Sequence, residues 1–291
     1  MATLVDNRYG KARVRVLRVF RESEQKHNIF DFDCRVLLKG DFSDTYLTGD
    51  NSKVVPTDTV KNTIYILAQQ ETFKSLEEFG IILGKHFIAN YSWVSGVEAV
   101  MKENVWRRVP VTVGTTNTTK EHDHSFQRDR EVHNCTVTSN RGKAPVVVSG
   151  IDDLLIMKTT QSGFEGYNKC KYTTLKETKD RVFATVVTAN WTYNSLNVDY
   201  TLAFEKFKQS VYDIFALTYS KSVQETLYLM AKKAMELCPQ IEQVHLSLPN
   251  KHAFGFDFAR LNLENKNVVF QPVEEPSGLI EGTIKRTNAK L

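Results

Sequence analysis

The chain has 291 residues, of which 41% are hydrophobic and 25% are charged, a composition typical of a globular protein with a sizeable core. Disordered and collagen-like classes are therefore excluded. The net charge of +4 is spread along the chain without a run of Lys and Arg, which argues against nucleic-acid binding. A mild positive balance favours an anionic small substrate.

The cysteines are few and widely spaced, and no CxxC motif occurs among Cys34, Cys135, Cys170 and Cys238. This spacing favours reduced thiols in a reducing compartment over a disulfide framework. No apolar run approaches the roughly 20 residues that cross a bilayer, and the N-terminus lacks a signal-peptide pattern. We therefore expect a protein with no membrane partner that is not secreted.

The apolar periodicity predicts strands and helices in the same order in both halves of the chain. In the first half the pattern predicts a strand at 30–38, helices at 57–69 and 76–91, and strands at 94–108 and 125–139. In the second half it predicts strands at 146–159 and 181–193, helices at 204–215 and 223–237, and strands at 244–248 and 254–258. Two capping boxes, Ser75 with Glu78 and Ser222 with Glu225, begin the second helix of each half.

These repeated patterns predict an α+β protein made of two tandem ββααββ units, with a boundary near residues 140–145. The expected domains are residues 1–142 and 143–291. An antiparallel sheet that is covered by helices on one face leaves two edges, and long edges tend to be paired or covered. Self-association is therefore expected.

Four short polar stretches carry groups that neither a core nor an ordinary surface requires. They are Arg8-Tyr9-Gly10-Lys11, Val55-Pro56-Thr57-Asp58, Tyr172 to Thr178 followed by Arg181, and Leu248-Pro249-Asn250-Lys251-His252. With Val54 to Tyr65 and Ser222-Val223-Gln224, they occur in order over nearly the whole chain and resemble the uricase (urate oxidase) family. The resemblance implies the tunnelling fold (T-fold), in which sheets of neighbouring subunits close into a barrel and two barrels stack. It also implies a homotetramer with active sites at subunit interfaces.

The resemblance implies that Arg181 and Gln224 bind the edge of urate and that Phe164 stacks on its face. Urate is planar and anionic and has carbonyl and N–H groups at its rim, which suits a guanidinium and an amide. Leu175 and Val223 match positions in the same pocket, although core packing explains both equally well. An isolated Arg at a strand start or Gln at a helix start is usually only solvated, so the prediction depends on the combined motif.

The resemblance further implies a proton relay of Lys11, Thr57 and His252. The implied reaction is oxidation of urate by dioxygen and water to 5-hydroxyisourate and hydrogen peroxide, with no metal, flavin or haem cofactor. If Lys11 acts as the base near neutrality, its pKa must fall by about 3 units from roughly 10.4. Alternatively, Lys11 stays charged and polarises the hydroxyl of Thr57, and the sequence leaves both mechanisms open.

Asp58 and Asn250 complete the implied site. Thr57 lies where a helix N-cap is expected, and the backbone N–H groups of Thr57 and Asp58 at a helix start form an anion site. Asn250 matches the amide that holds dioxygen, and then water, above the purine ring. An Asn after Pro is otherwise most often a turn former.

Two alternative functions remain open, a metal-dependent purine or pterin enzyme of the same fold and a catalytically silent purine-binding homologue. His122 and His124 could share one face of a strand and bind a metal, but the sequence offers no third ligand at a suitable spacing, so no metal site is predicted. The final residues Ala289-Lys290-Leu291 resemble the Ser-Lys-Leu peroxisomal address. We therefore expect recognition by a peroxisomal import receptor, although an ordinary frayed tail explains three residues alone equally well.

Overall fold

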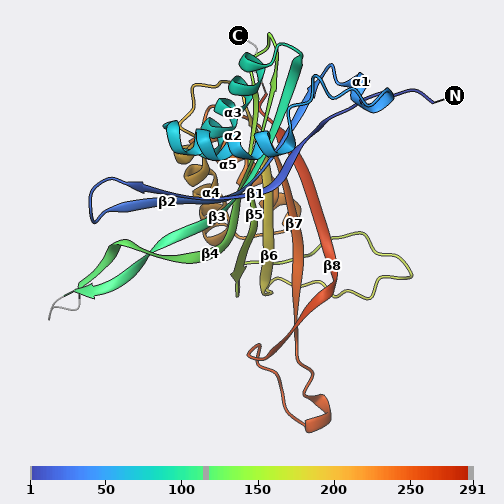
Figure 1. Cartoon of the computed structure of the whole chain (residues 1–291). Helices are drawn as coiled ribbons and strands as arrows, with labels where there is room; N and C mark the ends of the chain where they lie inside the picture. The colour runs from blue at the N-terminus through green and yellow to red at the C-terminus, as the bar shows by residue number, and fades with distance from the viewer. Residues whose placement is uncertain (1, 114–117, 288–291) are drawn as a thin grey trace. The chain divides into compact units, whose positions relative to one another are not determined.

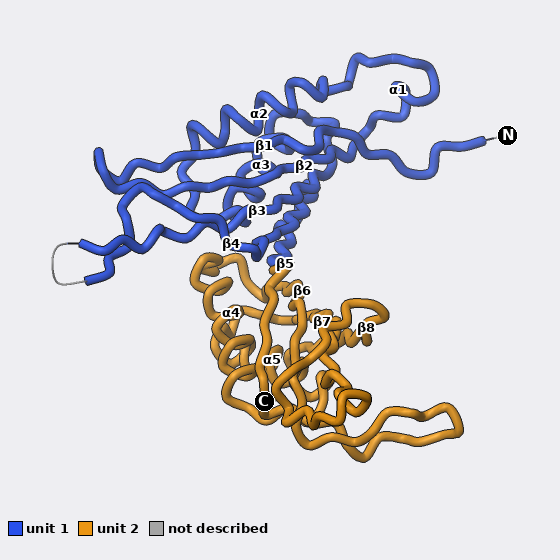
Figure 2. Tube along the Cα trace, turned by 90° about the horizontal axis from the view of Figure 1, so that it is seen from below, with its two compact units in different colours: residues 1–150 blue, residues 151–291 orange. Residues whose placement is uncertain are grey.

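The computed structural model describes residues 2–113 and 118–287, so the predicted address Ala289-Lys290-Leu291 lies outside the described residues. The chain forms two compact units, residues 1–150 and 151–291 (Figure 2). These are called unit 1 and unit 2. Within the described ranges no helix has both the length and the apolar character needed to cross a membrane.

Unit 1 is an antiparallel sheet with its helices between the second and third strands in the chain (Figure 1). Its strands pair in sequence order as β1 (Tyr9–Arg21), β2 (His27–Gly40), β3 (Val94–Val113) and β4 (Thr118–Asn140). The helices are α1 (Ser43–Leu47), α2 (Thr57–Gln70) and α3 (Leu76–Asn90). Strand β5 (Val146–Lys158) contains the boundary between the units.

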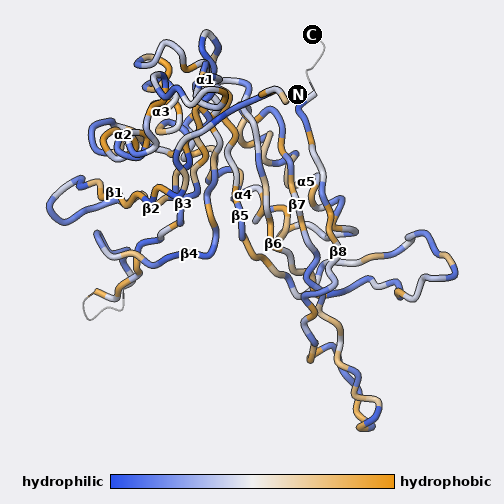
Figure 3. The backbone as a smooth tube through the Cα atoms, turned by 45° about the vertical axis from the view of Figure 1, so that its right-hand side comes forward, coloured by the Kyte–Doolittle hydropathy of each residue, from blue (hydrophilic) through white to orange (hydrophobic). Residues whose placement is uncertain are grey.

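The core of unit 1 follows from the predicted periodicities. Alternate residues of β2, from Phe32 to Leu38, are fully buried because successive side chains of a strand point to opposite faces. Val60 and Ile64 of α2 and Phe79 of α3 pack against this face of the sheet. In Figure 3 hydrophilic and hydrophobic colours alternate along the turns of α2, as expected of a helix with one buried side.

Unit 2 repeats the order of elements. Its strand β6 (Phe183–Tyr193) is followed by the helices α4 (Tyr200–Leu217) and α5 (Val223–Leu237). Strand β7 (Ile241–Gly255), the short 3₁₀ helix η1 (Ala259–Leu261) and strand β8 (Phe270–Lys285) complete the unit. Trp191 of β6 stacks on Phe207 of α4, with ring centroids 4.1 Å apart, at the centre of the core.

Both predicted capping boxes begin helices. The Oγ of Ser75 accepts a hydrogen bond from the backbone N–H of Glu78 (3.2 Å), and the Oγ of Ser222 accepts one from Glu225 (3.1 Å). Each cap satisfies a donor that the first helical turn leaves without an intrahelical partner. The α+β class and the ββααββ order are confirmed, and the antiparallel sheet is open at β1 and at β8.

Two predictions about elements are wrong. The expected strand at 254–258 does not form, because β7 ends at Gly255 and Phe258 precedes η1. The last strand is instead β8, which carries Pro272 and Pro276 and leaves most of its side chains exposed. Its first ten residues carry both prolines and show no alternating buried face, so this part does not resemble a strand, and only near its end do Ile280 and Ile284 pack against the core. Thr57 is the first helical residue of α2 rather than its N-cap, since Pro56 occupies that position.

Candidate active site

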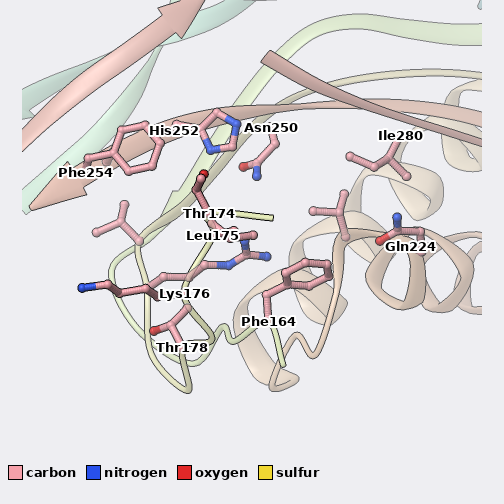
Figure 4. A pocket seen from close by; sticks show the side chains of 14 residues that line it. Phe164, Thr174, Leu175, Lys176, Thr178, Gln224, Asn250, His252, Phe254 and Ile280 are labelled. Carbon is pink, nitrogen blue, oxygen red and sulfur yellow. The ribbon is translucent and has the colours of Figure 1, made fainter. Parts of the chain in front are cut away.

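Unit 2 contains a cavity of about 700 Å³, a size typical of small-molecule sites. It is called the unit 2 cavity. Seven residues that the sequence singled out line it: Phe164, Leu175, Arg181, Val223, Gln224, Asn250 and His252. They come from the loop before β6, the start of α5 and strand β7, and Figure 4 shows how several of them surround the open space.

Arg181 is held on one side of the cavity by its own side-chain contacts. Its Nε donates a hydrogen bond to the Oγ of Ser162 (3.3 Å), and its Cζ lies 5.5 Å from the ring centroid of Phe164 and 6.0 Å from that of Phe183. Burial lowers the pKa of Arg181, but a guanidinium with an ordinary pKa above 12 remains charged. The cavity therefore contains a fixed cation.

Two backbone hydrogen bonds with Thr178 fix the position of Phe164. Its N–H donates to the carbonyl of Thr178 (2.7 Å), and its carbonyl accepts from the N–H of Thr178 (3.1 Å). The structure also shows why glycines occur on either side of Phe164 and Glu165. A Cβ on Gly163 would lie 2.2 Å from the Oη of Tyr219, and Gly166 has a φ of +68°, a conformation that favours glycine.

Gln224 and Val223 occupy the first turn of α5, directly after the capping Ser222. The cap fixes where the helix begins, and so it determines which side chains of the first turn reach the cavity. Val223 is 4% exposed and belongs to the core, while it also lines the cavity. Leu175, by contrast, is 55% exposed, so core packing does not explain its position.

Asn250 and His252 lie two residues apart on β7, a spacing that places both side chains on one face. Figure 4 shows them next to each other at the cavity. The pairing of β7 with β8 shifts between these residues, because Asn250 pairs with Gly278 and His252 with Val273. Such irregularities redirect side chains in strands. The His252 ring stacks nearly parallel on Phe254, at 5.4 Å between centroids.

The other predicted site residues, Lys11, Thr57 and Asp58, belong to unit 1. The motif that contains Lys11 contacts the motif that contains Thr57, since the Oη of Tyr9 accepts a hydrogen bond from the backbone N–H of Val55 (2.7 Å). Lys61 and, to a smaller extent, Lys11 hold the pKa of Asp58 below its ordinary value. Lys11 therefore lies near the start of α2.

Some residues that line the unit 2 cavity were not predicted, among them Thr174, Lys176, Thr178, Phe254 and Ile280. Thr174, Lys176 and Thr178 lie within the recognised stretch from Tyr172 to Thr178, so their place at the cavity could have been inferred. Phe254 continues the alternation of Asn250 and His252. Ile280 had no signal, because the strand that carries it was itself not predicted.

The two histidines that were considered as metal ligands lie next to each other. The rings of His122 and His124 meet edge to face, with centroids 4.4 Å apart. Among residues 2–113 and 118–287, no three His, Cys, Asp or Glu side chains are arranged to hold a metal ion. All four cysteines are free thiols.

The unit 2 cavity combines a guanidinium, two amides, an imidazole and an aromatic face, a set suited to a flat anionic heterocycle. The fold and this site define an α+β protein with a cavity suited to such a molecule. The uricase family model matches residues 7–138 and 147–281. The chain therefore belongs to the uricase family and is an oxidoreductase, a urate oxidase.

Individual relatives agree with this assignment. The chain is 73% identical to the uricase of Dictyostelium discoideum, over the full length of both proteins. It is 38% identical to the uricase of Arthrobacter globiformis, over 99% of this chain and 91% of that protein. The crystal structure of the Arthrobacter globiformis uricase superimposes with a TM-score of 0.90, covering 100% of this chain and 97% of the other.

Proposed function

We propose that the unit 2 cavity is the site at which this chain oxidises urate with dioxygen and water to 5-hydroxyisourate and hydrogen peroxide. The observation that carries the proposal is that Phe164, Arg181, Gln224, Asn250 and His252 all line one cavity. These residues come from three separate parts of the sequence, and each has the chemistry needed to bind a planar anion or to handle protons. Membership of the uricase family supports the reaction.

In the proposed complex, Arg181 and Gln224 bind the edge of urate and Phe164 lies against its face. The guanidinium donates to carbonyl oxygens and the amide both donates and accepts, which matches the alternating groups at the rim of the purine. Leu175 and Val223 form apolar walls. Thr57 and Asp58 contribute the backbone N–H groups of a helix start, which favour negative charge.

The proposed chemistry needs no external reductant, because urate itself supplies two electrons. Dioxygen accepts these electrons and two protons and leaves as hydrogen peroxide, while the oxygen of water adds to C5 of the purine as a hydroxyl group. Asn250 holds first dioxygen and then water above the ring. Lys11, Thr57 and His252 move the protons, and positioned groups of this kind typically accelerate a reaction by about 10²–10⁴-fold.

We propose that the complete site forms between subunits of a homotetramer whose sheets close into barrels. The division of the predicted residues supports this arrangement, since Lys11, Thr57 and Asp58 belong to unit 1, whereas the residues around the cavity belong to unit 2. Two T-fold domains, residues 1–142 and 143–291, are part of the same proposal.

Purine degradation in the peroxisome is the final part of the proposal. The tripeptide Ala289-Lys290-Leu291 supports recognition by the import receptor, and an oxidase that releases hydrogen peroxide is well placed beside catalase. A fluorescent protein fused to residues 281–291 should enter peroxisomes. The same fusion with Leu291→Ser should remain in the cytosol.

One assay tests the reaction against both alternatives. After exhaustive chelation and dialysis, the purified protein should remove urate absorbance and consume one dioxygen per urate. If a stoichiometric metal has to be returned before turnover resumes, the protein is instead a metal-dependent enzyme of the same fold. If urate binds without dioxygen uptake, it is a catalytically silent homologue.

A further inference from the structure

Ser162 is a fully buried residue of unit 2 whose side chain contacts the guanidinium of Arg181 at the cavity. Its Oγ accepts the hydrogen bond from the Nε of Arg181 (3.3 Å). Ser162 does not itself line the unit 2 cavity. The residue therefore lies behind the guanidinium, on the side away from the space that a ligand fills.

The contact determines which part of the guanidinium is available to a ligand. Arginine has five N–H donors in a rigid plane, one on Nε and two on each terminal nitrogen. Ser162 engages the Nε donor, whereas neither terminal nitrogen donates to any other residue of the described ranges. The rings of Phe164 and Phe183 lie within 6.0 Å of Cζ. The free donors are those that a bidentate ligand requires.

Ser162 is in turn held rigidly by the connection between α4 and α5. It forms an isolated parallel bridge with Ser220. The backbone N–H of Gly163 donates to the carbonyl of Ser220, and the N–H of Ser220 donates to the carbonyl of Gln161, each at 2.9 Å. A third hydrogen bond ties Ser220 to strand β5, because the Nζ of Lys158 donates to the Oγ of Ser220 at 2.9 Å.

We propose that Ser162 is a positioning residue for substrate recognition, which fixes the guanidinium of Arg181 through Nε so that the two terminal nitrogens face the purine edge. This inference rests on the proposed function and assigns a role to a residue that does not touch the substrate. Removal of the oxygen leaves a buried N–H without its acceptor and allows the guanidinium to turn away from the productive plane.

A double-mutant cycle separates this role from a general structural one. The variants are Ser162→Ala, Arg181→Ala and the double variant, and the probe is xanthine, a purine that lacks the oxygen at C8. Binding is measured by titration calorimetry and urate oxidation by steady-state kinetics. Ser210→Ala is the matched control, because Ser210 is also fully buried in unit 2 and its hydroxyl donates only to the carbonyl of Phe207 within α4.

Ser162→Ala should weaken xanthine binding about tenfold and raise KM for urate by a similar factor, with kcat changed less than about twofold. In the Arg181→Ala background the same change should alter xanthine affinity by less than about twofold. Ser210→Ala should leave affinity unchanged. Ser162→Cys keeps the size of the side chain but is a weak acceptor, so it should reproduce the loss and carries the test if Ser162→Ala does not fold.

An equal loss in both backgrounds would show that Ser162 acts independently of Arg181 and would overturn the inference. Native affinity in both Ser162 variants would overturn it as well. If the unaltered chain neither binds xanthine nor consumes urate, the proposed function fails, and this inference fails with it. If the native chain binds xanthine and oxidises urate but the effects of Ser162→Ala and Arg181→Ala on xanthine affinity are additive, the proposed function stands and only the positioning role of Ser162 is contradicted.

Discussion

At the residue scale, a planar guanidinium distinguishes Arg181 from the neutral amides of the cavity, Gln224 and Asn250. A charge-assisted bidentate contact contributes roughly 1.5–3 kcal/mol, whereas a neutral hydrogen bond contributes about 1 kcal/mol. Arg181→Ala should therefore weaken the binding of urate and of xanthine more than Gln224→Ala does. Dissociation constants of both variants, measured under identical conditions, give the order. A reversed order would mean that the purine binds in a different orientation.

The second prediction at this scale concerns Lys11 and separates proton transfer from binding. Lys11→Met keeps the length of the side chain but removes its charge and its proton. Because the proposed relay acts on protons and not on the purine edge, kcat should fall by about two orders of magnitude or more while xanthine affinity stays near native. Near-native turnover would show that Lys11 is not part of the relay. Arg13→Met is a control on the same strand, since Arg13 also carries a charge near the bulge of β1.

At the element scale, the two serine caps offer a matched pair of helices. Ser75 and Ser222 cap α3 and α5 with hydrogen bonds of 3.2 and 3.1 Å. Replacing either serine by alanine should lower the free energy of unfolding by about 1 kcal/mol. Only Ser222→Ala should also weaken xanthine binding, because Val223 and Gln224 follow that cap directly. Denaturant titrations and calorimetry on the two variants measure both effects.

If Ser75→Ala weakens binding as much as Ser222→Ala does, the loss reflects general destabilisation. If neither variant changes affinity, the start of α5 does not position Gln224.

A buried ion pair connects α3 to the sheet of unit 1. The Nε2 of His133 contacts the Oε1 of Glu77 (2.9 Å), and its Nδ1 contacts the Oε2 of Glu103 (3.1 Å). Burial alone would lower the pKa of His133, but Glu77 and Glu103 outweigh burial and raise that pKa to about 10. Burial likewise opposes ionisation of Glu77, yet His133 and Ser149 hold the pKa of Glu77 below its ordinary value.

The direction of these pKa shifts predicts how stability depends on pH. The contribution of His133 is complete below its unfolded pKa of about 6.5 and is lost as pH rises towards about 10. His133→Gln should cost about 3–5 kcal/mol near pH 6, because it leaves a buried charge without its partner. The difference from the native chain should shrink between pH 6.5 and 10. Thermal unfolding across this range measures the effect.

His86→Gln is the control for the pH series. Burial lowers the pKa of His86, so this side chain is neutral in both the folded and the unfolded chain above about pH 7.5. Its replacement should therefore shift stability by an amount that does not vary with pH in that range. A His133→Gln difference that is equally constant would contradict the ionised pair.

At the scale of the whole molecule, the proposed shared site makes complementation possible. Thr57→Ala and Arg181→Ala should each inactivate the enzyme. In a mixed dimer with two-fold symmetry, one site carries both changes and the other carries neither. With random exchange half of the dimers are mixed, so about a quarter of native activity should return. Native mass spectrometry confirms the exchange, and mixed assemblies without activity would show that each site forms within one chain.

The sequence by itself determined much of the fold and most of the residues around the cavity. Strand β2 and helices α2, α3 and α5 were predictable, because their buried faces repeat at the periods of a strand or a helix. Strand β8 was not, since most of its side chains are exposed, it carries two prolines, and only Ile280 and Ile284 near its end pack against the core. Phe164, Arg181, Gln224 and His252 were identified by motifs whose order along the chain is specific, although none of them is informative alone.

Only the tertiary structure decided which of these residues share one cavity and what holds them there. The contact between Ser162 and Arg181 joins residues that are 19 positions apart, and no local pattern distinguishes Ser162 from other serines. The partnership of His133 with Glu77 spans 56 positions and depends on how α3 packs against β4. Local periodicity determines which face of an element is buried, but hydrogen bonds between distant side chains arise only when the packed elements bring them together.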